Sequence, residues 1–396
     1  MSKLPRVCLF TSFHPDLGGG GSACLQSAIA HFTRVEVRWL FVGSQDAVFH
    51  NSCRVGRSFL GGGLLLDLLA APLLWAGWRS RELRQVVAVL AAEPADAYWF
   101  VAMNEGILAG NALANDSKKP FHVSVWDDQA EAICRRSRRY RWLEPLALRG
   151  WKKLLGRAGS VDVISSGMQD YYRKHRQLDS EVFHPYVPHL PPAPSALNDT
   201  ELHVGHIGTL YSECEVLAFM RGAASAARQL GRRLRLSFIG RNRINPADHA
   251  ALLPGDAVIE VSPSLPEEEA MAKLSACHLL YAMYPFDERC RVFRMTSLPT
   301  KLSSYIQAQR PVFAHTPADS TLADMVQRHS IGSVCASLDI PVIAEAVKAA
   351  LRCRPAPGVF ESMRAAEYGE QNVISLEDAL LRLATSRGTP LSAGAY

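Results

Sequence analysis

A lysine that follows a proline-containing loop is the clearest candidate for ligand binding in this sequence. Ser297-Leu298-Pro299 is typical of a loop leading into a helix, because proline is favoured near the first helical turn. Lys301 would then lie in that first turn, beside backbone N–H groups that have no partner within the helix. A positive helix end and an ammonium group together attract phosphate. The spacing therefore predicts a diphosphate site at Lys301.

Two adjacent carboxylates follow a predicted strand at 122–126. In this position Asp127 and Asp128 could orient an acceptor hydroxyl, accept its proton or hold a metal. The alternative is that one of them only caps the helix predicted to begin at Gln129. Both interpretations stay open, since one carboxylate can cap the helix while the other faces a substrate. We name both as catalytic candidates.

Glycines follow two other predicted strands. A run of four glycines begins at Gly18, after the first strand and before a helix. Glycines let the backbone approach a ligand, so Gly19 and Gly20 are binding candidates, although a flexible loop is the alternative. The run does not have the GxGxxG spacing of dinucleotide-binding folds. Gly208 and Thr209 follow a strand in the second half of the chain and are candidates for the same reason.

Arginines follow the predicted strand that ends at Ile239. Arg241 and Arg243 stand in the loop directly after it. A guanidinium group at the end of a parallel strand can neutralise a phosphate. Either arginine taken alone is also compatible with a solvated loop residue.

Short strand-like runs alternate with helix-like stretches along the whole chain. This alternation predicts βα units on parallel sheets that are covered on both faces. The predicted strands are 7–11, 35–42, 97–101, 122–126, 161–165, 203–207, 234–239, 257–261, 278–282 and 311–314. The predicted helices include 21–32, 79–92, 215–230, 267–276 and 376–384.

The length of 396 residues exceeds what one hydrophobic core usually serves and favours two domains. A stretch with four prolines, at 186–194, interrupts the periodicity and is typical of a stiff, extended linker. The sequence therefore predicts an N-terminal Rossmann-like domain at 1–187, a linker at 188–200 and a C-terminal Rossmann-like domain at 201–375. The final helix and tail, 376–396, could pack back across the linker.

Composition narrows the function classes. A hydrophobic content of 48% and a charged content of 20% describe an ordinary folded protein. The net charge of +5 comes mainly from 134–157, which holds nine basic residues and Glu144 as its one acidic residue. Such a local excess favours a local anionic partner over nucleic-acid binding. The nine cysteines occur singly, which argues against disulfides or a zinc site and for a reducing cytoplasm.

Two segments bear on membrane association. Residues 59–78 are very apolar, but Asp67, Pro72 and glycines interrupt them. The uninterrupted pieces fall short of the roughly 20 residues that a spanning helix needs, so we expect a buried or interfacial helix.

The basic segment has helical spacing on two faces. Apolar residues such as Trp151 and Leu154 recur on one face, and Arg149, Lys153 and Arg157 recur on another. A helix of this kind can lie on an anionic inner membrane surface, although a core-packed helix with a solvated basic face is an open alternative. No signal peptide opens the sequence. We therefore expect a cytoplasmic protein, or one bound peripherally to the inner membrane face.

The segment around Lys301 resembles a motif of GT-B glycosyltransferases. Ser297-Leu298-Pro299-Thr300-Lys301-Leu302, followed by Tyr305 and Arg310-Pro311-Val312, is similar to the PxKxxEYxAxGxPV stretch of family-4-like (glycosyl transferases group 1) enzymes. Further segments resemble the family in the same order, from about Val7 to Val334: the glycine loop after Pro15, Asp162 to Met168, His206-Ile207-Gly208-Thr209-Leu210, and the turn at Gly332.

The resemblance implies two Rossmann-like doubly wound domains facing a cleft, with a nucleotide-sugar donor in the C-terminal domain and an acceptor in the N-terminal domain. It implies transfer of a hexose from a UDP- or GDP-sugar to a glycan or lipid-linked acceptor, as in bacterial cell-surface polysaccharide or glycoconjugate synthesis. The nucleotide-sugar is a co-substrate, and no cofactor is expected. Fixed positive groups and a helix N-terminus can stabilise the departing diphosphate, so no metal is expected either.

The sequence departs from the family pattern at several positions. Ser304 stands where the family has the glutamate before the tyrosine, and Thr296 stands where a partner glutamate would be. Thr209 replaces an arginine. The resemblance therefore implies that diphosphate binding relies on Arg241, Arg294 and Lys301, and that recognition of the sugar hydroxyls differs, with Ser304 in place of the acid.

Two other functions remain compatible with the sequence. A GT-B sugar-nucleotide epimerase cleaves the same donor bond without a second sugar, and the adjacent Asp127 and Asp128 leave that reaction open. A catalytically silent GT-B binding partner is the alternative outside enzymes, and the missing glutamates keep it open.

Overall fold

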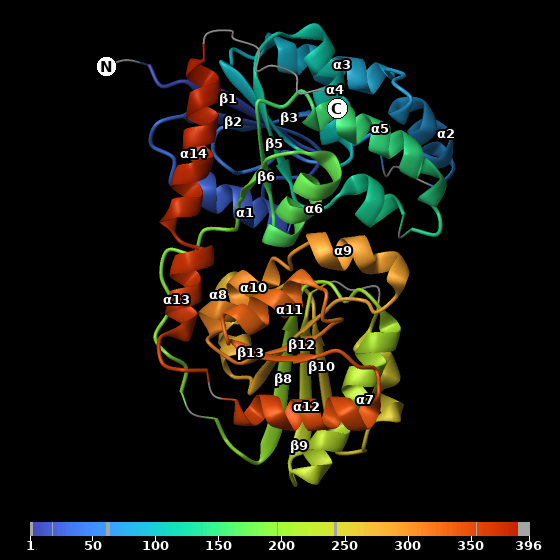
Figure 1. Cartoon of the computed structure of the whole chain (residues 1–396), viewed down its shortest axis with the longest axis vertical. Coiled ribbons are helices and arrows are strands. Elements are labelled where there is room, and N and C mark those ends of the chain that lie inside the picture. Colours follow the sequence, from blue (N-terminus) through green and yellow to red (C-terminus); the bar gives the residue numbers. More distant parts are fainter. Residues whose placement is uncertain are drawn as a thin grey trace. The chain divides into compact units, whose positions relative to one another are not determined.

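The chain forms two compact units in the computed structural model. The model describes residues 3–17, 19–60, 64–135, 137–195, 197–240, 244–353 and 355–386, and of 64–69 only the backbone. The N-terminal unit consists of Met1–Tyr186 and Gly369–Tyr396, and the C-terminal unit consists of Val187–Tyr368. The first crossing between the units falls within one residue of the domain boundary expected at 187. In both units the strands lie between layers of helices (Figure 1).

The N-terminal unit contains a parallel sheet of seven strands. Their order is β3-β2-β1-β4-β5-β6-β7, so the chain moves outward from β1 in one direction and then in the other. This reversal creates a topological switch point, where doubly wound folds bind ligands at the carboxyl ends of the strands. The strands are β1 (Arg6–Thr11), β2 (Glu36–Val42), β3 (Ser52–Gly56), β4 (Ala97–Val101), β5 (Phe121–Val125), β6 (Ser160–Val163) and β7 (Glu181–Val182).

Helices cover both faces of this sheet. On one face, Leu25 of α1 and Leu380 of α14 share a buried cluster with Leu9 and Trp39 of the sheet. On the other face, Gly110 of α4 lies against Phe100 of β4. The described helical elements are α1 (Gly20–Ile29), α2 (Leu64–Trp75), α3 (Arg81–Ala92), α4 (Glu105–Asp116), η1 (Gln129–Cys134), η2 (Arg141–Leu143), α5 (Glu144–Leu155), α6 (Ser166–Arg176) and α14 (Glu370–Thr385).

The C-terminal helix α14 belongs to the N-terminal unit. The carboxylate of its Glu377 is buried, and Oε1 accepts hydrogen bonds from the backbone N–H groups of Thr33 and Arg34 at 2.6 and 2.5 Å. The guanidinium group of Arg34 donates to Oε2 of Glu377 at 3.0 Å and to Asp378. The end of the chain therefore packs onto the N-terminal unit, a packing that the helical pattern at 376–384 had left possible.

The C-terminal unit contains a second parallel sheet, with six strands in the order β10-β9-β8-β11-β12-β13. The strands are β8 (Glu201–Ile207), β9 (Arg233–Ile239), β10 (Val258–Ser262), β11 (Leu279–Met283), β12 (Val312–His315) and β13 (Gly332–Cys335). The described helical elements are α7 (Glu213–Gln229), η3 (Pro246–Leu252), α8 (Glu267–Ser275), η4 (Glu288–Cys290), α9 (Arg291–Thr296), α10 (Lys301–Ala308), α11 (Thr321–Arg328), α12 (Ile340–Arg352) and α13 (Val359–Glu367). The two sheets confirm the α/β class with two Rossmann-like domains.

The proline-rich linker is bound to the C-terminal unit along its length. Gln309 and Arg310 donate hydrogen bonds to the carbonyl groups of Pro191 and Ser195, at 2.6 and 2.7 Å. Arg364 of α13 donates to the carbonyl of Val187 at 3.0 Å. The prolines keep the segment extended, and these side chains hold it in place.

The apolar segment at 59–78 contains α2, which has 12 residues and includes Pro72. Leu74 and Trp75 near its end are buried, whereas Leu73 is 54% exposed. Among the described residues, no helix combines the length and the apolar character needed to cross a membrane.

Candidate functional site

Lys301 is the first residue of α10, as the sequence predicted. Its Nζ donates a hydrogen bond to the carbonyl of Thr209 at 2.9 Å and lies 5.5 Å from the centre of the Tyr211 ring. A Cβ placed on Gly208 would lie 3.7 Å from Cε of Lys301. The fold therefore brings Lys301 to Gly208 and Thr209 at the carboxyl end of β8, although Lys301 is more than 90 positions away from them in sequence.

The ammonium group of Lys301 is buried without a counter-charge. Lys301 is 8% exposed, and burial lowers its pKa to about 7. Within the described part of the chain, no carboxylate forms an ion pair with it. A buried cation without a partner is unfavourable, because the charge loses its hydration and gains no attraction in return. An anionic ligand would supply the missing attraction.

His206 and Tyr305 hold the end of β8 in shape beneath Lys301. Burial and the charge of Lys301 lower the pKa of His206, so its ring is neutral. Its Nδ1 lies 2.9 Å from the carbonyl oxygen of Tyr281, and its Nε2 lies 3.2 Å from the carbonyl oxygen of Gly208 and 3.4 Å from Nζ of Lys301. The hydroxyl of Tyr305 donates to the carbonyl of Tyr281 at 2.7 Å and accepts from the N–H of Ile207 at 3.3 Å.

Sequence reasoning did not single out His206, because a histidine inside an apolar strand usually belongs to the core. The one available signal was the polar side chain of His206 two positions before Gly208, near the end of that strand.

Glycines with positive φ angles follow two neighbouring strands, β8 and β9. Gly208 after β8 has φ +85°, and Gly240 after β9 has φ +123°, a backbone conformation that favours glycine. A Cβ on Gly240 would lie 3.3 Å from the backbone N of Gly208. Ser304 lies one turn beyond Lys301 in α10 and is partly exposed. Arg241, the remaining candidate of this loop, lies outside the described residues.

Arg294 occupies a different environment from the one expected of a phosphate ligand. It is 3% exposed, its Nε donates to Asp319 at 2.7 Å, and one terminal nitrogen donates to Glu288 at 2.7 Å. The other terminal nitrogen donates to the carbonyl of Asp287 at 3.2 Å. Two carboxylates already balance its charge, so the geometry disfavours Arg294 as a diphosphate ligand.

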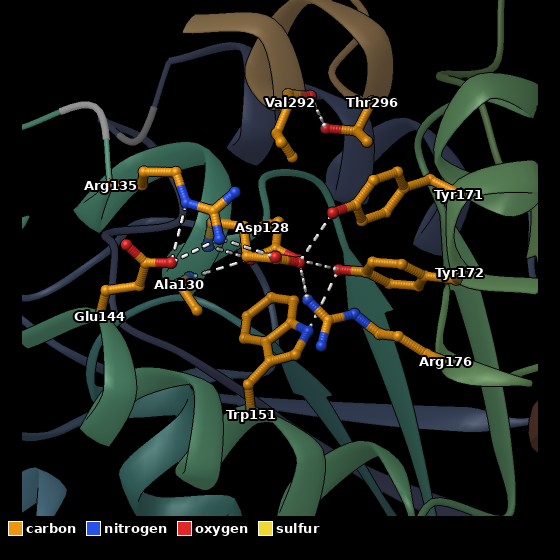
Figure 2. Close-up of polar contacts among 11 residues, drawn as sticks. Asp128, Ala130, Arg135, Glu144, Trp151, Tyr171, Tyr172, Arg176, Val292 and Thr296 are labelled. Carbon is orange, nitrogen blue, oxygen red and sulfur yellow. Dashed lines mark hydrogen bonds and ion pairs between the residues drawn. The ribbon is translucent and has the colours of Figure 1, made fainter. Parts of the chain in front are cut away.

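Thr296, at the position of the family's partner glutamate, also makes a local contact. Its hydroxyl donates to the carbonyl of Val292 within α9 at 2.6 Å (Figure 2).

Asp128 in the N-terminal unit is fully buried at the start of η1. Its Oδ1 accepts hydrogen bonds from the N–H groups of Ala130 and Glu131, at 3.0 and 2.7 Å, so the carboxylate caps this helical turn. Its Oδ2 accepts from the hydroxyl of Tyr172 at 3.0 Å and from Arg176 at 2.9 Å (Figure 2). The capping alternative therefore describes Asp128, and its catalytic assignment is disfavoured.

Burial raises the pKa of Asp128, and the neighbouring Arg176 opposes that shift. Asp127, which is partly exposed, remains as the candidate for proton transfer.

The glycine loop and the Asp127 segment meet at Trp126. Gly19 is the N-cap residue of α1 with φ +65°, and Gly20 is the first residue of the helix. A Cβ on Gly21 would lie 2.5 Å from the Trp126 ring, so a larger residue would clash there. The carboxyl ends of β1 and β5 therefore approach each other at this tryptophan, and they bring the two predicted binding segments of the N-terminal unit together.

The basic helix α5 packs differently from a membrane-bound helix. Trp151 and Leu154 are fully buried in the N-terminal unit, and the indole N–H of Trp151 donates to the hydroxyl of Tyr172 at 3.1 Å (Figure 2). The apolar face is thus part of the core and is not available to lipid, which corrects the expectation of an amphipathic membrane-binding helix. Lys152 and Lys153 on the opposite face are exposed.

The described residues contain no group of three or more histidine, cysteine, aspartate or glutamate side chains placed to hold a metal ion.

No protein-family model matches the sequence, and a search of curated proteins found no match. Solved structures are similar over almost the whole chain. A sucrose-phosphate synthase from Thermosynechococcus elongatus has a TM-score of 0.67 at 14% identity, with 96% of this chain and 99% of that chain covered.

Two further structures extend the comparison. The lipopolysaccharide outer core galactosyltransferase WaaB has a TM-score of 0.62 at 12% identity, over 95% of this chain and 99% of that chain. A putative UDP-N-acetylglucosamine 2-epimerase from Listeria monocytogenes has a TM-score of 0.59 at 12% identity, over 98% and 100%. The shared arrangement of two Rossmann-like sheets shows that the chain has the GT-B fold, as its resemblance to GT-B glycosyltransferases predicted.

Proposed function

We propose that the protein is a GT-B glycosyltransferase that transfers a sugar from a nucleotide-sugar donor to a hydroxyl acceptor. The observation that carries this proposal is the buried ammonium group of Lys301, which has no carboxylate partner in the described chain and lies beside Gly208 and Thr209 at the start of α10. A diphosphate would give this cation its counter-charge. The positive end of the α10 dipole would add to this attraction, although the N–H groups of Leu302 and Ser303 in its first turn already donate to the carbonyl groups of Pro299 and Thr300.

The chemistry follows from where negative charge develops. In the transfer step, the acceptor oxygen bonds to the anomeric carbon and the bond between that carbon and the diphosphate oxygen breaks. The leaving nucleoside diphosphate keeps the electron pair, and Lys301 stabilises the charge that it gains. The acceptor hydroxyl releases a proton, which we assign to Asp127. The free Lys301 has a pKa of about 7, and a bound diphosphate would raise it and keep the side chain charged.

The finer assignments concern the substrates and the place of reaction. We propose a UDP- or GDP-hexose as donor and a glycan or lipid-linked glycan as acceptor, in synthesis of bacterial cell-surface polysaccharide or glycoconjugate. The exposed Lys152 and Lys153 support attraction to an anionic inner membrane surface by charge alone. The protein would then be cytoplasmic and peripherally bound.

A sugar-nucleotide epimerase is the second candidate, because a putative UDP-N-acetylglucosamine 2-epimerase shares the fold over 98% of this chain. An epimerase would bind the same diphosphate at Lys301 but would need no acceptor. A catalytically silent partner would bind the nucleotide and convert nothing.

Incubation with radiolabelled UDP- and GDP-hexoses, with and without membrane extract, separates these three functions. Transfer to an extract-dependent product supports the glycosyltransferase, conversion of the donor without extract supports the epimerase, and binding alone supports the silent partner. Lys301→Met should reduce donor use at least tenfold, because loss of a charge-assisted phosphate contact costs about 1.5–3 kcal/mol. Lys348→Met is the matched control, since Lys348 already pairs with Glu345 on α12. Unchanged donor kinetics in Lys301→Met would remove Lys301 from the site.

A further inference from the structure

A small cavity lies in the N-terminal unit between α14 and the amino ends of β5, β6 and β7. Its volume is about 200 Å³. Parallel strands place their amino ends at the opposite edge of the sheet from their carboxyl ends, where the proposed transfer takes place. This cavity, which we call the α14 cavity, is therefore separate from the proposed transfer site. Its walls include Ser160, Asp162 and Ser180 on the side of the sheet and Ser375, Leu376 and Ala379 of α14.

A chain of hydrogen bonds fixes the side chain of Asp162 in the wall of the α14 cavity. Asp162 is 3% exposed, and its Oδ2 lies 2.5 Å from Nε2 of His122. The hydroxyl of Ser124 donates to the same oxygen at 2.6 Å and accepts from the indole N–H of Trp99 at 2.8 Å. Nδ1 of His122 lies 2.7 Å from the hydroxyl oxygen of Ser160. These contacts set the orientation of the carboxylate and occupy one of its two oxygens.

Two other polar atoms of the cavity residues are buried without a hydrogen-bond partner. They are Oδ1 of Asp162 and the hydroxyl oxygen of Ser180, and neither bonds to any residue that the structure describes. A buried carboxylate oxygen without a donor is unfavourable, because it loses its hydration and gains no hydrogen bond in return. Both residues line the α14 cavity, so a molecule bound there could supply the missing contacts. The two unpartnered atoms therefore point to a ligand.

The charges around the cavity favour a cation. Besides the buried Asp162, the lining includes Asp179 and Glu181, whose side chains are exposed. Arg382 lies 3.7 Å from Glu181, which leaves the acidic residues in excess. One carboxylate oxygen and one hydroxyl are too few ligands for a metal ion. An ammonium group has three N–H donors and no acceptor, so it matches these two atoms better.

The apolar part of the lining limits the rest of the ligand. Phe183 and Leu376 are buried and line the cavity together with Val161. The volume is below the roughly 300–1,000 Å³ of sites for drug-sized ligands. Apolar walls in so small a space suit a few methylene groups better than a sugar or a nucleotide.

We propose that the α14 cavity binds a short aliphatic amine, whose ammonium group pairs with Oδ1 of Asp162 and donates a hydrogen bond to the hydroxyl oxygen of Ser180. This site is additional to the proposed nucleotide-sugar site and does not depend on it.

Calorimetric titration of the full chain with n-butylamine tests this proposal, and 1-butanol is the uncharged probe of similar shape. Asp162→Asn removes the charge and nearly keeps the shape of the side chain. Asp170→Asn is the matched control, because the Asp170 carboxylate is exposed on α6 of the same unit and does not line the cavity. Ser375→Leu narrows the cavity from α14 and leaves Asp162 in place.

We expect Asp162→Asn to weaken n-butylamine binding about tenfold or more, because a charge-assisted contact is lost. Ser375→Leu should weaken it similarly, whereas Asp170→Asn should bind like the native protein. The proposal is overturned if the native protein does not bind n-butylamine, if it binds 1-butanol as tightly, or if Asp162→Asn keeps the native affinity. Should Asp162→Asn fail to fold, native affinity in Ser375→Leu overturns it. The affinity for UDP should be the same in all folded variants.

Discussion

Two buried charges, one in each unit, show how differently the fold treats ionised groups. Asp128 in the N-terminal unit is surrounded by two backbone N–H groups, the Tyr172 hydroxyl and the guanidinium group of Arg176. Lys301 in the C-terminal unit has a carbonyl group, a neutral histidine and an aromatic ring, and no described carboxylate pairs with it. Removal of one partner of a paired buried charge destabilises the structure, whereas a buried charge without a counter-charge is a candidate for binding an anionic ligand.

The largest loss of stability should come from removing the cation that pairs with the buried Asp128. Arg176→Met would leave the buried Asp128 and the neighbouring Glu131 without their shared cation, and breaking a buried pair typically costs about 3–5 kcal/mol. Urea unfolding should show this loss in the free energy of unfolding. Arg173→Met is the control, because the Arg173–Asp170 pair is exposed and should contribute at most about 1 kcal/mol. Similar losses in the two variants would mean that the Asp128–Arg176 pair is not a special structural contact.

Lys301 should make the free energy of unfolding rise with pH, the opposite direction to a carboxyl group such as Asp128, whose pKa burial raises. Its folded pKa is about 7, below the unfolded value of about 10.4, so the unfolded chain binds more protons between these values. The free energy of unfolding of the native protein should therefore rise with pH from 7 to 9, relative to Lys301→Met, by up to about 1.4 kcal/mol per pH unit. Below pH 7 the difference between the two proteins should be constant. Parallel stability profiles from pH 7 to 9 would show that burial does not lower the pKa of Lys301.

Replacing exposed charges should have smaller energetic effects than replacing Arg176 or Lys301, and we expect these effects on membrane binding. Replacing Arg149, Lys152, Lys153 and Arg157 by glutamine should weaken binding to anionic liposomes by about 1 kcal/mol or less per residue, and added salt should weaken native binding in the same way. The folding of the N-terminal unit and the binding of UDP should be unchanged. Equal sedimentation of native and glutamine-substituted protein with anionic and neutral vesicles would show that the basic face of α5 is only solvated surface.

The smallest expected effect is that of a chelator. If the charge that balances the diphosphate is the ammonium group of Lys301, sugar transfer should be the same with and without EDTA. Loss of activity in EDTA that Mg²⁺ or Mn²⁺ restores would argue that the leaving group is stabilised by a metal.

Much of the fold follows directly from the sequence pattern. The runs that form β1, β2, β4, β8 and β9 are apolar and flanked by turn residues, and the structure has strands there within one or two residues. The short strand β3 was not predicted, because its sequence Ser-Cys-Arg-Val-Gly has no apolar run. Pairing with β2 makes it a strand, and pairing is a tertiary property.

The sequence by itself determined the residue types at the ends of the strands, and with them Lys301, Gly208 and Asp127 as candidates. Only the tertiary structure decided which charges have partners. The sequence around Arg294 and Asp128 does not reveal that their charges are paired, because their counter-ions Asp319 and Arg176 lie 25 and 48 positions away.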